Sequence, residues 1–260
     1  MTALDGLLRS EIAIFLLECA RISGVIIVAP LAWANAPARV KVALVLMLAI
    51  VAHGLSDKTV VPNSMFDTGI ALCFELMVGV AMGFVVRLIV AIAEMVGEIV
   101  SPAIGLGVAT AFDPTTHSQQ NVITSILRYF IVFIALVVGV HRIVLGGMLA
   151  GFRLLPVGTV SSLRELLPTF IELSSRAIEA GVRIALPIIA ILYMTQIALA
   201  FVARAAPQMQ VFNVGFAVML AVGLFLLGSI LPDINRGFLI ELSQIGPRIE
   251  SILGALGATL

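Results

Sequence analysis

Carboxylates and guanidinium groups occur inside apolar stretches of this chain, where an ionisable side chain costs about 2.5–3.5 kcal/mol at the middle of a bilayer. Glu94 and Glu98 stand four residues apart, and like charges at this spacing destabilise an isolated helix unless they face water or a cation. Glu18 and Arg21 stand three apart on one helix face and could neutralise each other. These groups could relay protons or ions, or they could face protein neighbours or a wet vestibule. We favour the second interpretation, because intramembrane charges usually face a protein interior or water.

No catalytic, cofactor or metal motif is recognisable in the sequence. His53, His117 and His141 are widely separated, and neither an HExxH motif nor a cluster of cysteines and histidines occurs. Gly105-Leu106-Gly107 lacks the later glycine and the preceding strand that dinucleotide binding requires. We therefore expect no enzyme activity, no cofactor and no bound metal.

The composition places these residues in a membrane protein. Hydrophobic residues make up 61% of the chain and charged residues 12%, and the mean hydropathy is +1.17. A formal net charge of zero gives no reason to expect a nucleic acid partner. We expect an all-α fold in one integral membrane unit, residues 1–260, with six or seven helices at about 20 residues per span. The apolar windows are Ile12–Ala34, Val42–Leu55, Gly69–Ala93, Val122–Val140, Ile143–Val157, Ala177–Val202 and Val214–Leu231.

Small and charged residues indicate how the helices could be used. Gly79 and Gly83 form a GxxxG motif that permits close helix contact, although this motif also arises by chance in glycine-rich membrane chains. Between residues 164 and 183, glutamates and arginines recur at i,i+3 and i,i+4 spacing, which is typical of a solvated helix. Residues 237–260 predict an amphipathic helix that is interrupted at Gly246-Pro247.

The segment Gly105–Gln120 is polar and glycine-bearing between apolar flanks. It could be an ordinary exposed loop, but its own apolar residues indicate that it packs into something. A re-entrant segment or plug fits, because non-helical backbone at membrane depth must line a cavity or lie inside protein. Its candidate residues are Gly105, Leu106, Gly107, Phe112, Asp113, Pro114, Gln119 and Gln120.

A second polar segment, residues 204–216, separates the last two apolar windows. It carries a charge, a proline and three amides, which need partners that lipid cannot supply. We expect a hinge whose side chains bond to protein or water. Its candidate residues are Arg204, Pro207, Gln208, Gln210, Phe212 and Asn213.

Three sets of residues, in order and over nearly the whole chain, resemble the FliR family of flagellar biosynthetic proteins, the T subunits of type III protein export gates. The N-terminal set is Arg21, Gly24, Ala29-Pro30, Pro37 and Arg39. The middle set is Glu75, Gly79, Gly83, Gly97, GLGVA at 105–109 and Asp113-Pro114. The last set is Ala185-Leu186-Pro187 followed by ARAAPQMQVFNVGF at 203–216.

The resemblance implies a role that composition cannot reveal. Such proteins join P-type and Q-type subunits, and an associated export-switch membrane protein, in a hetero-oligomer that forms the entry channel for exported flagellar proteins. It implies a bacterial inner-membrane location within the flagellar basal body, in contact with membrane lipid. Residues 1–160 would form P-subunit-like helices, with the plug at 105–120. Residues 161–260 would form an amphipathic helix, a Q-subunit-like hairpin at 177–231 and a C-terminal helix.

Two alternatives stay open at this point. Virulence-associated secretion systems share most of these motifs, although the VFNVGF wording favours the flagellar branch. A self-contained transporter could use the embedded charges as a solute path, but it predicts an inverted repeat that the sequence does not display. The chain departs from the family pattern at Gly139-Val140-His141 and in the uncharged GFAVML after the hinge.

Overall fold

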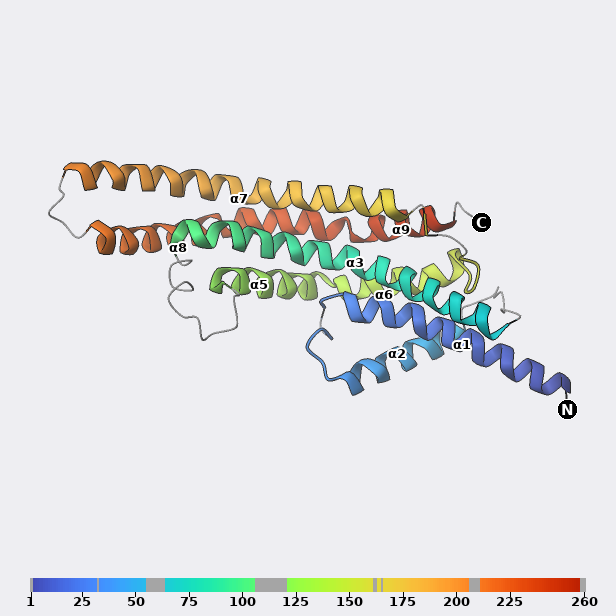
Figure 1. The fold of residues 1–260 in the computed structure, drawn as a ribbon. Helices are drawn as coiled ribbons and strands as arrows, with labels where there is room; N and C mark the ends of the chain where they lie inside the picture. Colours follow the sequence, from blue (N-terminus) through green and yellow to red (C-terminus); the bar gives the residue numbers. More distant parts are fainter. Residues whose placement is uncertain are drawn as a thin grey trace. The chain divides into compact units, whose positions relative to one another are not determined.

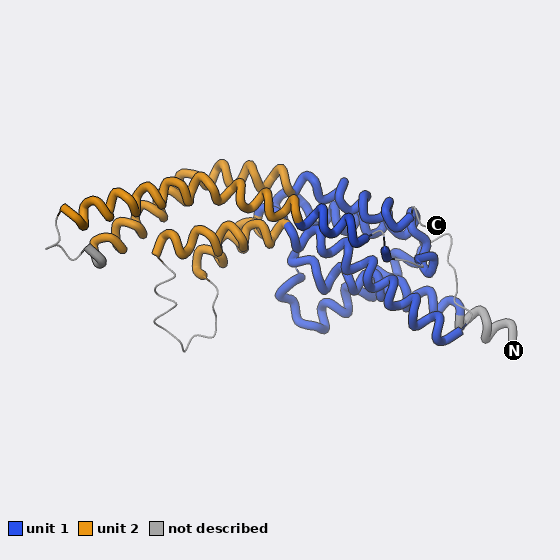
Figure 2. Tube along the Cα trace, turned by 45° about the horizontal axis from the view of Figure 1, so that its top comes forward, with its two compact units in different colours: residues 1–88, 134–174, 242–260 blue, residues 89–133, 175–241 orange. Residues whose placement is uncertain are grey.

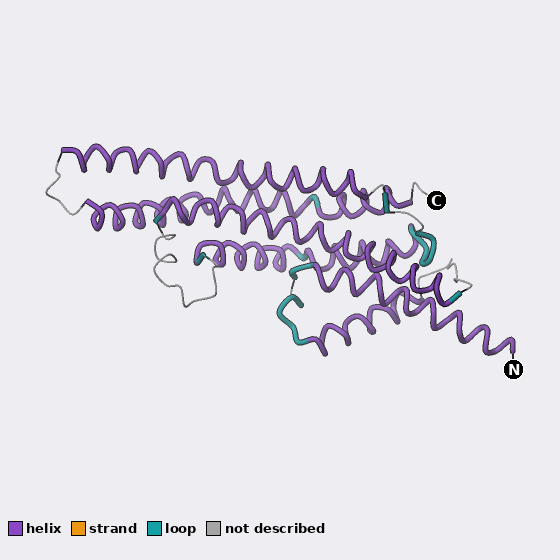
Figure 3. Tube along the Cα trace, viewed as in Figure 1, coloured by secondary structure: helices purple, strands orange, loops and turns teal. Residues whose placement is uncertain are grey.

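The computed structural model describes residues 2–31, 33–54, 64–105, 121–160, 163–164, 166–205 and 211–257 of the chain. Within these ranges the ordered elements are all helices, with no strand (Figures 1 and 3). The all-α prediction is therefore confirmed. The helices are α1 (Thr2–Val28), α2 (Ala38–His53), α3 (Met65–Ile104), α5 (Val122–Val138), α6 (Val140–Leu154), α7 (Leu166–Ala205), α8 (Val211–Ser243) and α9 (Ile245–Gly257).

Three stretches of the described helices are long and apolar enough to cross a membrane: α3, α7 and the run from Val214 to Gly257. A fourth is possible if α5 and α6 count as one span, since they meet at a bend of 66°. The apolar windows therefore outnumber the described stretches that are long and apolar enough to span. One reason is that α2 has 16 residues, about 24 Å at 1.5 Å per residue, which is short of a bilayer core of about 30 Å. Another is that the apolar part of α1 carries Glu11, Glu18 and Arg21.

The chain divides into two compact units (Figure 2). Unit 1 comprises residues 1–88, 134–174 and 242–260, and unit 2 comprises residues 89–133 and 175–241. This division follows spatial contact and not the order of the chain, so each unit combines segments that are distant in the sequence.

Unit 1 is built around two helix pairs, α1 with α2 and α6 with α9. The buried face of α6 repeats about every fourth residue, as a helix that packs along one side requires. Gly147 lies under the Ile249 side chain and Gly151 under Leu253, so α9 packs against the glycine face of α6. The buried α6 residues are Val140, Val144, Met148, Gly151 and Phe152.

The C-terminal amphipathic segment breaks at a different residue from the one predicted. The helix break falls at Gln244, and Gly246 and Pro247 lie inside the first turn of α9. Proline is tolerated in the first turn because the backbone N–H groups there have no partner within the helix.

In unit 2, small residues again mark close packing. A Cβ at Gly97 would lie 2.5 Å from the Cα of Thr124 on α5. A Cβ at Gly223 on α8 would lie 2.6 Å from the Ile104 side chain. The second part of α3 therefore has α5 and α8 against it, and the glycines leave no room for a larger side chain.

Candidate functional site

A buried ion pair joins α1 to α3 in unit 1. The Nε of Arg21 lies 2.6 Å from Oε2 of Glu75, and the two side chains are 0% and 1% exposed. A charge taken out of water needs a charged partner and further hydrogen bonds to offset its lost solvation. Each of these residues therefore depends on the other.

The remaining contacts of this pair reach α6 and the turn after it. Arg21 Nη1 donates to the carbonyl oxygen of Leu155 at 2.8 Å, and its guanidinium lies 4.8 Å from the centre of the Phe152 ring. The backbone N–H of Gly158 donates to Glu75 Oε1 at 2.9 Å. The network thus fixes the N-terminal part of α3, the C-terminal end of α6 and α1 in one arrangement.

The direct partners of Arg21 and Glu18 are not each other. Arg21 pairs with Glu75 on another helix, whereas Glu18 contacts His53 of α2. Residues three apart on a helix are neighbours, but a buried guanidinium can turn to whichever carboxylate also lies inside the protein. Spacing along one helix therefore did not identify the partner.

The helix crossing between α1 and α3 lies beside this ion pair. A Cβ placed on Gly79 would overlap the carbonyl oxygen of Arg21. A Cβ on Gly24 would lie 2.5 Å from the carbonyl oxygen of Leu76, and one on Gly83 would lie 3.0 Å from that of Val25. The GxxxG residues of α3 therefore face the backbone of α1, which is the geometry that such motifs permit.

Three members of the N-terminal set, Pro30, Pro37 and Arg39, lie where α1 ends and α2 begins. Pro30 lies two residues after the last residue of α1, and Pro37 is the N-cap of α2 with φ −56° and ψ 149°. Lys41 donates from Nζ to the carbonyl oxygen of Ala34 at 2.8 Å, which closes the turn. Arg39 is exposed. The two prolines thus shape the turn between α1 and α2. Of the four candidates Arg21, Pro30, Pro37 and Arg39, Arg21 is the one that belongs to the buried network with Glu75.

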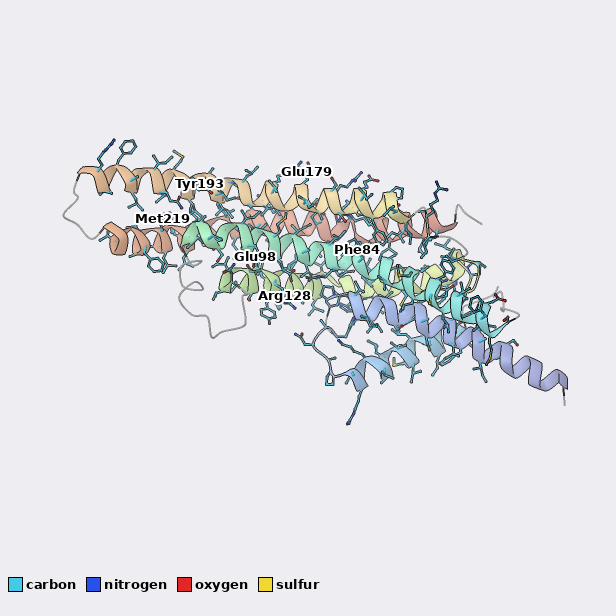
Figure 4. All side chains as sticks on the ribbon, in the orientation of Figure 1. Phe84, Glu98, Arg128, Glu179, Tyr193 and Met219 are labelled. Carbon is cyan, nitrogen blue, oxygen red and sulfur yellow. The ribbon has the colours of Figure 1, made fainter. Side chains whose placement is uncertain are left out.

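In unit 2 the two glutamates that recur at i,i+4 on α3 both contact side chains of α5. Figure 4 labels Glu98 on α3 and Arg128 on α5. Glu98 accepts from Thr124 Oγ1 at 2.8 Å and from Asn121 Nδ2 at 2.9 Å. The Nε of Arg128 lies 3.6 Å from Glu94 Oε1. This arrangement matches the interpretation that the embedded carboxylates face a protein neighbour.

The plug candidates lie almost wholly outside the described residues. Gly105 is described: it follows α3 with φ 97°, a left-handed conformation that glycine adopts without strain, and its N–H donates to the carbonyl oxygen of Pro102 at 3.0 Å. Glycine therefore ends α3 here. Leu106, Gly107, Phe112, Asp113, Pro114, Gln119 and Gln120 lie outside the described residues.

The hinge candidates extend from the last turn of α7 to the first turn of α8. Arg204 lies in the last turn of α7, where a cation interacts favourably with the helix dipole. Phe212 and Asn213 belong to the first turn of α8, and their side chains lie outside the described part of the chain. Pro207, Gln208 and Gln210 lie outside the described residues as well.

The helices α7 and α8 carry most of their apolar surface outward. Only 17% of the most apolar window in α7 is buried, and 11% of that in the Val214–Gly257 helix, against 67% for α3. Tyr193 and Phe201 on α7 are 56% and 68% exposed, and Phe225 on α8 is 74% exposed. Apolar surface of this extent requires lipid or protein against it.

Sequence reasoning did not identify the polar partners of three carboxylates: His53 for Glu18, Arg128 for Glu94, and Asn121 and Thr124 for Glu98. The sequence does hold a signal for Asn121 and Thr124, because both stand at the start of an apolar helix, on the same face as Arg128. His53 ends α2 within an apolar window, which gave no indication of its partner.

Apolar helices able to cross a membrane, with their embedded charges paired between helices, define a polytopic all-helical membrane protein. The sequence profile of the family described as "Bacterial export proteins, family 1" matches residues 12–245. The chain belongs to this family, which is one of export proteins and not of enzymes.

Named relatives agree with this assignment. The chain is 28% identical over 199 residues, 76% of each chain, to the flagellar biosynthetic protein FliR of Escherichia coli strain K12. It is 28% identical over 219 residues to FliR of Bacillus subtilis strain 168, covering 82% of this chain and 84% of the relative. It is 29% identical over 158 residues to FliR of Pectobacterium carotovorum, covering 61% of this chain and 60% of the relative.

Proposed function

We propose that this chain is a structural, pore-forming subunit of the bacterial flagellar type III protein export gate, in the inner membrane within the basal body. The observation that carries the proposal is the family match over residues 12–245, together with relatives named as flagellar biosynthetic proteins. Those names support the flagellar branch over a virulence-associated system. The chain would assemble with P-type and Q-type subunits and the export-switch membrane protein into a channel for exported flagellar proteins.

The length of α7 supports a place within a larger assembly. Its 40 residues extend about 60 Å, twice the roughly 30 Å thickness of a bilayer core. The part that carries Glu179 and Arg183 is charged and exposed, and it would lie outside the hydrocarbon. Apolar surface on a helix that reaches beyond the bilayer needs protein to cover it.

Within this proposal the segments keep the roles that the resemblance implies. Residues 1–160 form the P-subunit-like part, and the Arg21–Glu75 network fixes three of its helices. Residues 161–260 supply the Q-subunit-like hairpin, 177–231, whose exposed face meets Q-type subunits or lipid. Residues 105–120 act as a plug of the resting channel. The energy for export comes from other components of the channel, because the sequence of this chain holds no nucleotide-binding motif.

Co-purification tests the proposal. The tagged full-length chain is expressed in its host and extracted in mild detergent, and its partners are identified by mass spectrometry. P-type and Q-type subunits should accompany it in a defined complex, whereas expression alone should yield an unstable or aggregated chain. A well-behaved isolated monomer would contradict the proposal. Robust solute flux by the chain alone in liposomes would instead support a self-contained transporter.

A further inference from the structure

His53 lies between two carboxylates of α1 at the C-terminal end of α2. Its Nδ1 is 3.1 Å from Glu18 Oε2, and its Nε2 is 3.2 Å from Glu11 Oε2. The two glutamates stand seven residues apart, so they share one face of α1 two turns apart. All three residues belong to unit 1, in which α1 and α2 pack together.

The two N···O contacts of His53 require a particular protonation state. A neutral imidazole has one N–H donor and one lone pair, and an ionised carboxylate only accepts. Both N···O contacts can be hydrogen bonds only if the group holds one proton more than a neutral histidine between two carboxylates. That proton can sit on the imidazole, or on one carboxyl group that donates to the ring. Without it, one ring nitrogen and one carboxylate oxygen face each other with lone pairs only.

The surroundings favour retention of the extra proton and leave it access to water. Glu18 is 0% exposed, and its Oε1 is buried without a hydrogen-bond partner, so an ionised Glu18 is poorly solvated. His53 occupies the last turn of α2, where the helix dipole favours a cation. Glu11 and His53 are 61% and 39% exposed, which gives the proton a path to solvent.

The cations of α1 and α2 whose side chains the structure describes have partners of their own or lie away from this cluster. On α1, Arg21 stands three residues from Glu18, and it is bonded to Glu75 of α3 and to the Leu155 carbonyl. The described cations on α2, Arg39 and Lys41, lie at the opposite end of that helix from His53. Among the described residues, no group of three His, Cys, Asp or Glu is arranged to hold a metal ion.

We propose that Glu11, Glu18 and His53 form a proton-binding site. When the site carries one exchangeable proton, it holds the C-terminal end of α2 against α1. When that proton is lost, the end of α2 is released from α1. The contact is complete at low pH and is lost as the pH rises. Phe15, whose ring meets the His53 ring edge-on at 6.2 Å, keeps the imidazole in place between the two carboxylates. This inference is independent of the export assignment, because it rests on these contacts alone.

Distance measurement by electron spin resonance tests the site in the full chain, purified with whatever subunits accompany it. Spin labels replace the exposed Ile12 of α1 and Ile50 of α2, with Cys19 and Cys73 removed. As the pH is raised from about 5 to about 8, the population of short distances should be lost. An unchanged distribution across this range overturns the proposal.

Two variants sharpen the test. Glu18→Gln supplies a permanent amide donor to the ring, so the short distance should persist at every pH. His141→Ala removes the other described histidine and should leave the pH response intact. A pH response that survives Glu18→Gln, or one that disappears with His141→Ala, also overturns the proposal.

Discussion

The guanidinium of Arg21 and the carboxylate of Glu75 lie 2.6 Å apart in the interior of unit 1, although 54 residues separate them in the sequence. Such a pair has asymmetric energetics. Removal of both charges can be nearly neutral, whereas removal of one leaves the other buried without a counter-charge. The pair therefore specifies which helices meet more than it adds to stability.

Arg21→Leu should destabilise the chain by about 3–5 kcal/mol, because it leaves Glu75 buried and unpaired. Unfolding in a mixed detergent and denaturant titration would measure the loss. Arg21→Leu combined with Glu75→Leu should recover part of it. Recovery would be incomplete, since the carbonyl of Leu155 and the N–H of Gly158 lose their partners. The exposed Arg39→Leu is the matched control. Equal losses for Arg21→Leu and Arg39→Leu would refute the argument.

Gly79→Ala should force α1 and α3 apart, because the added methyl group overlaps the backbone carbonyl of Arg21, which cannot rotate away. Overpacking of this kind costs about 1–3 kcal/mol. Gly69→Ala on the same helix has nothing within 4 Å of the new Cβ, and it should be neutral or slightly stabilising. Thermal aggregation in detergent would compare the two variants. A Gly79→Ala variant as stable as Gly69→Ala would show that the crossing tolerates a side chain.

Glu98→Ala should loosen α5 from α3. The buried hydroxyl of Thr124 would lose a charged acceptor worth about 1.5–3 kcal/mol, whereas Asn121 can turn to water. Glu179→Ala is the control, because its pair with Arg183 is exposed and worth only about 0.3–0.5 kcal/mol. Hydrogen exchange of α5 would detect the loosening directly. The interpretation fails if the exchange rates in α5 are the same in both variants.

The sequence predicted the type of element well, since each apolar window overlaps a described helix. It predicted the ends and the pairings less well. The third apolar window ends at Ala93, before Glu94 and Glu98, yet α3 continues to Ile104, and Thr124 and Arg128 of α5 contact those two carboxylates. Hydropathy registers the cost of a charge within an apolar segment, but it does not identify the partner that offsets this cost, because the partner is set by tertiary contact.

Shortening of residues 105–120 should make the assembled complex leaky to ions, if this segment closes the resting channel. The physical reason is that a constriction depends on the volume of the segment that fills it, and a shorter segment fills less. Ion conductance of the reconstituted complex would measure the leak. A seal as tight as that of the unaltered complex would eliminate the plug assignment, while leaving the chain's place in the complex unaffected.

Replacement of Arg204 or Gln208 by leucine should disturb assembly before it alters any transport rate. Arg204 ends α7 next to exposed apolar surface, so its guanidinium is placed to bond with a neighbouring subunit or with water at the hinge. Leucine cannot make that bond, and it adds apolar surface where polar contact is expected. The amount of intact complex recovered in mild detergent should fall, and Leu167→Ala, far from the hinge at the start of α7, provides the control. If complexes carrying the hinge substitutions form in normal amounts, the segment between α7 and α8 serves only as a turn.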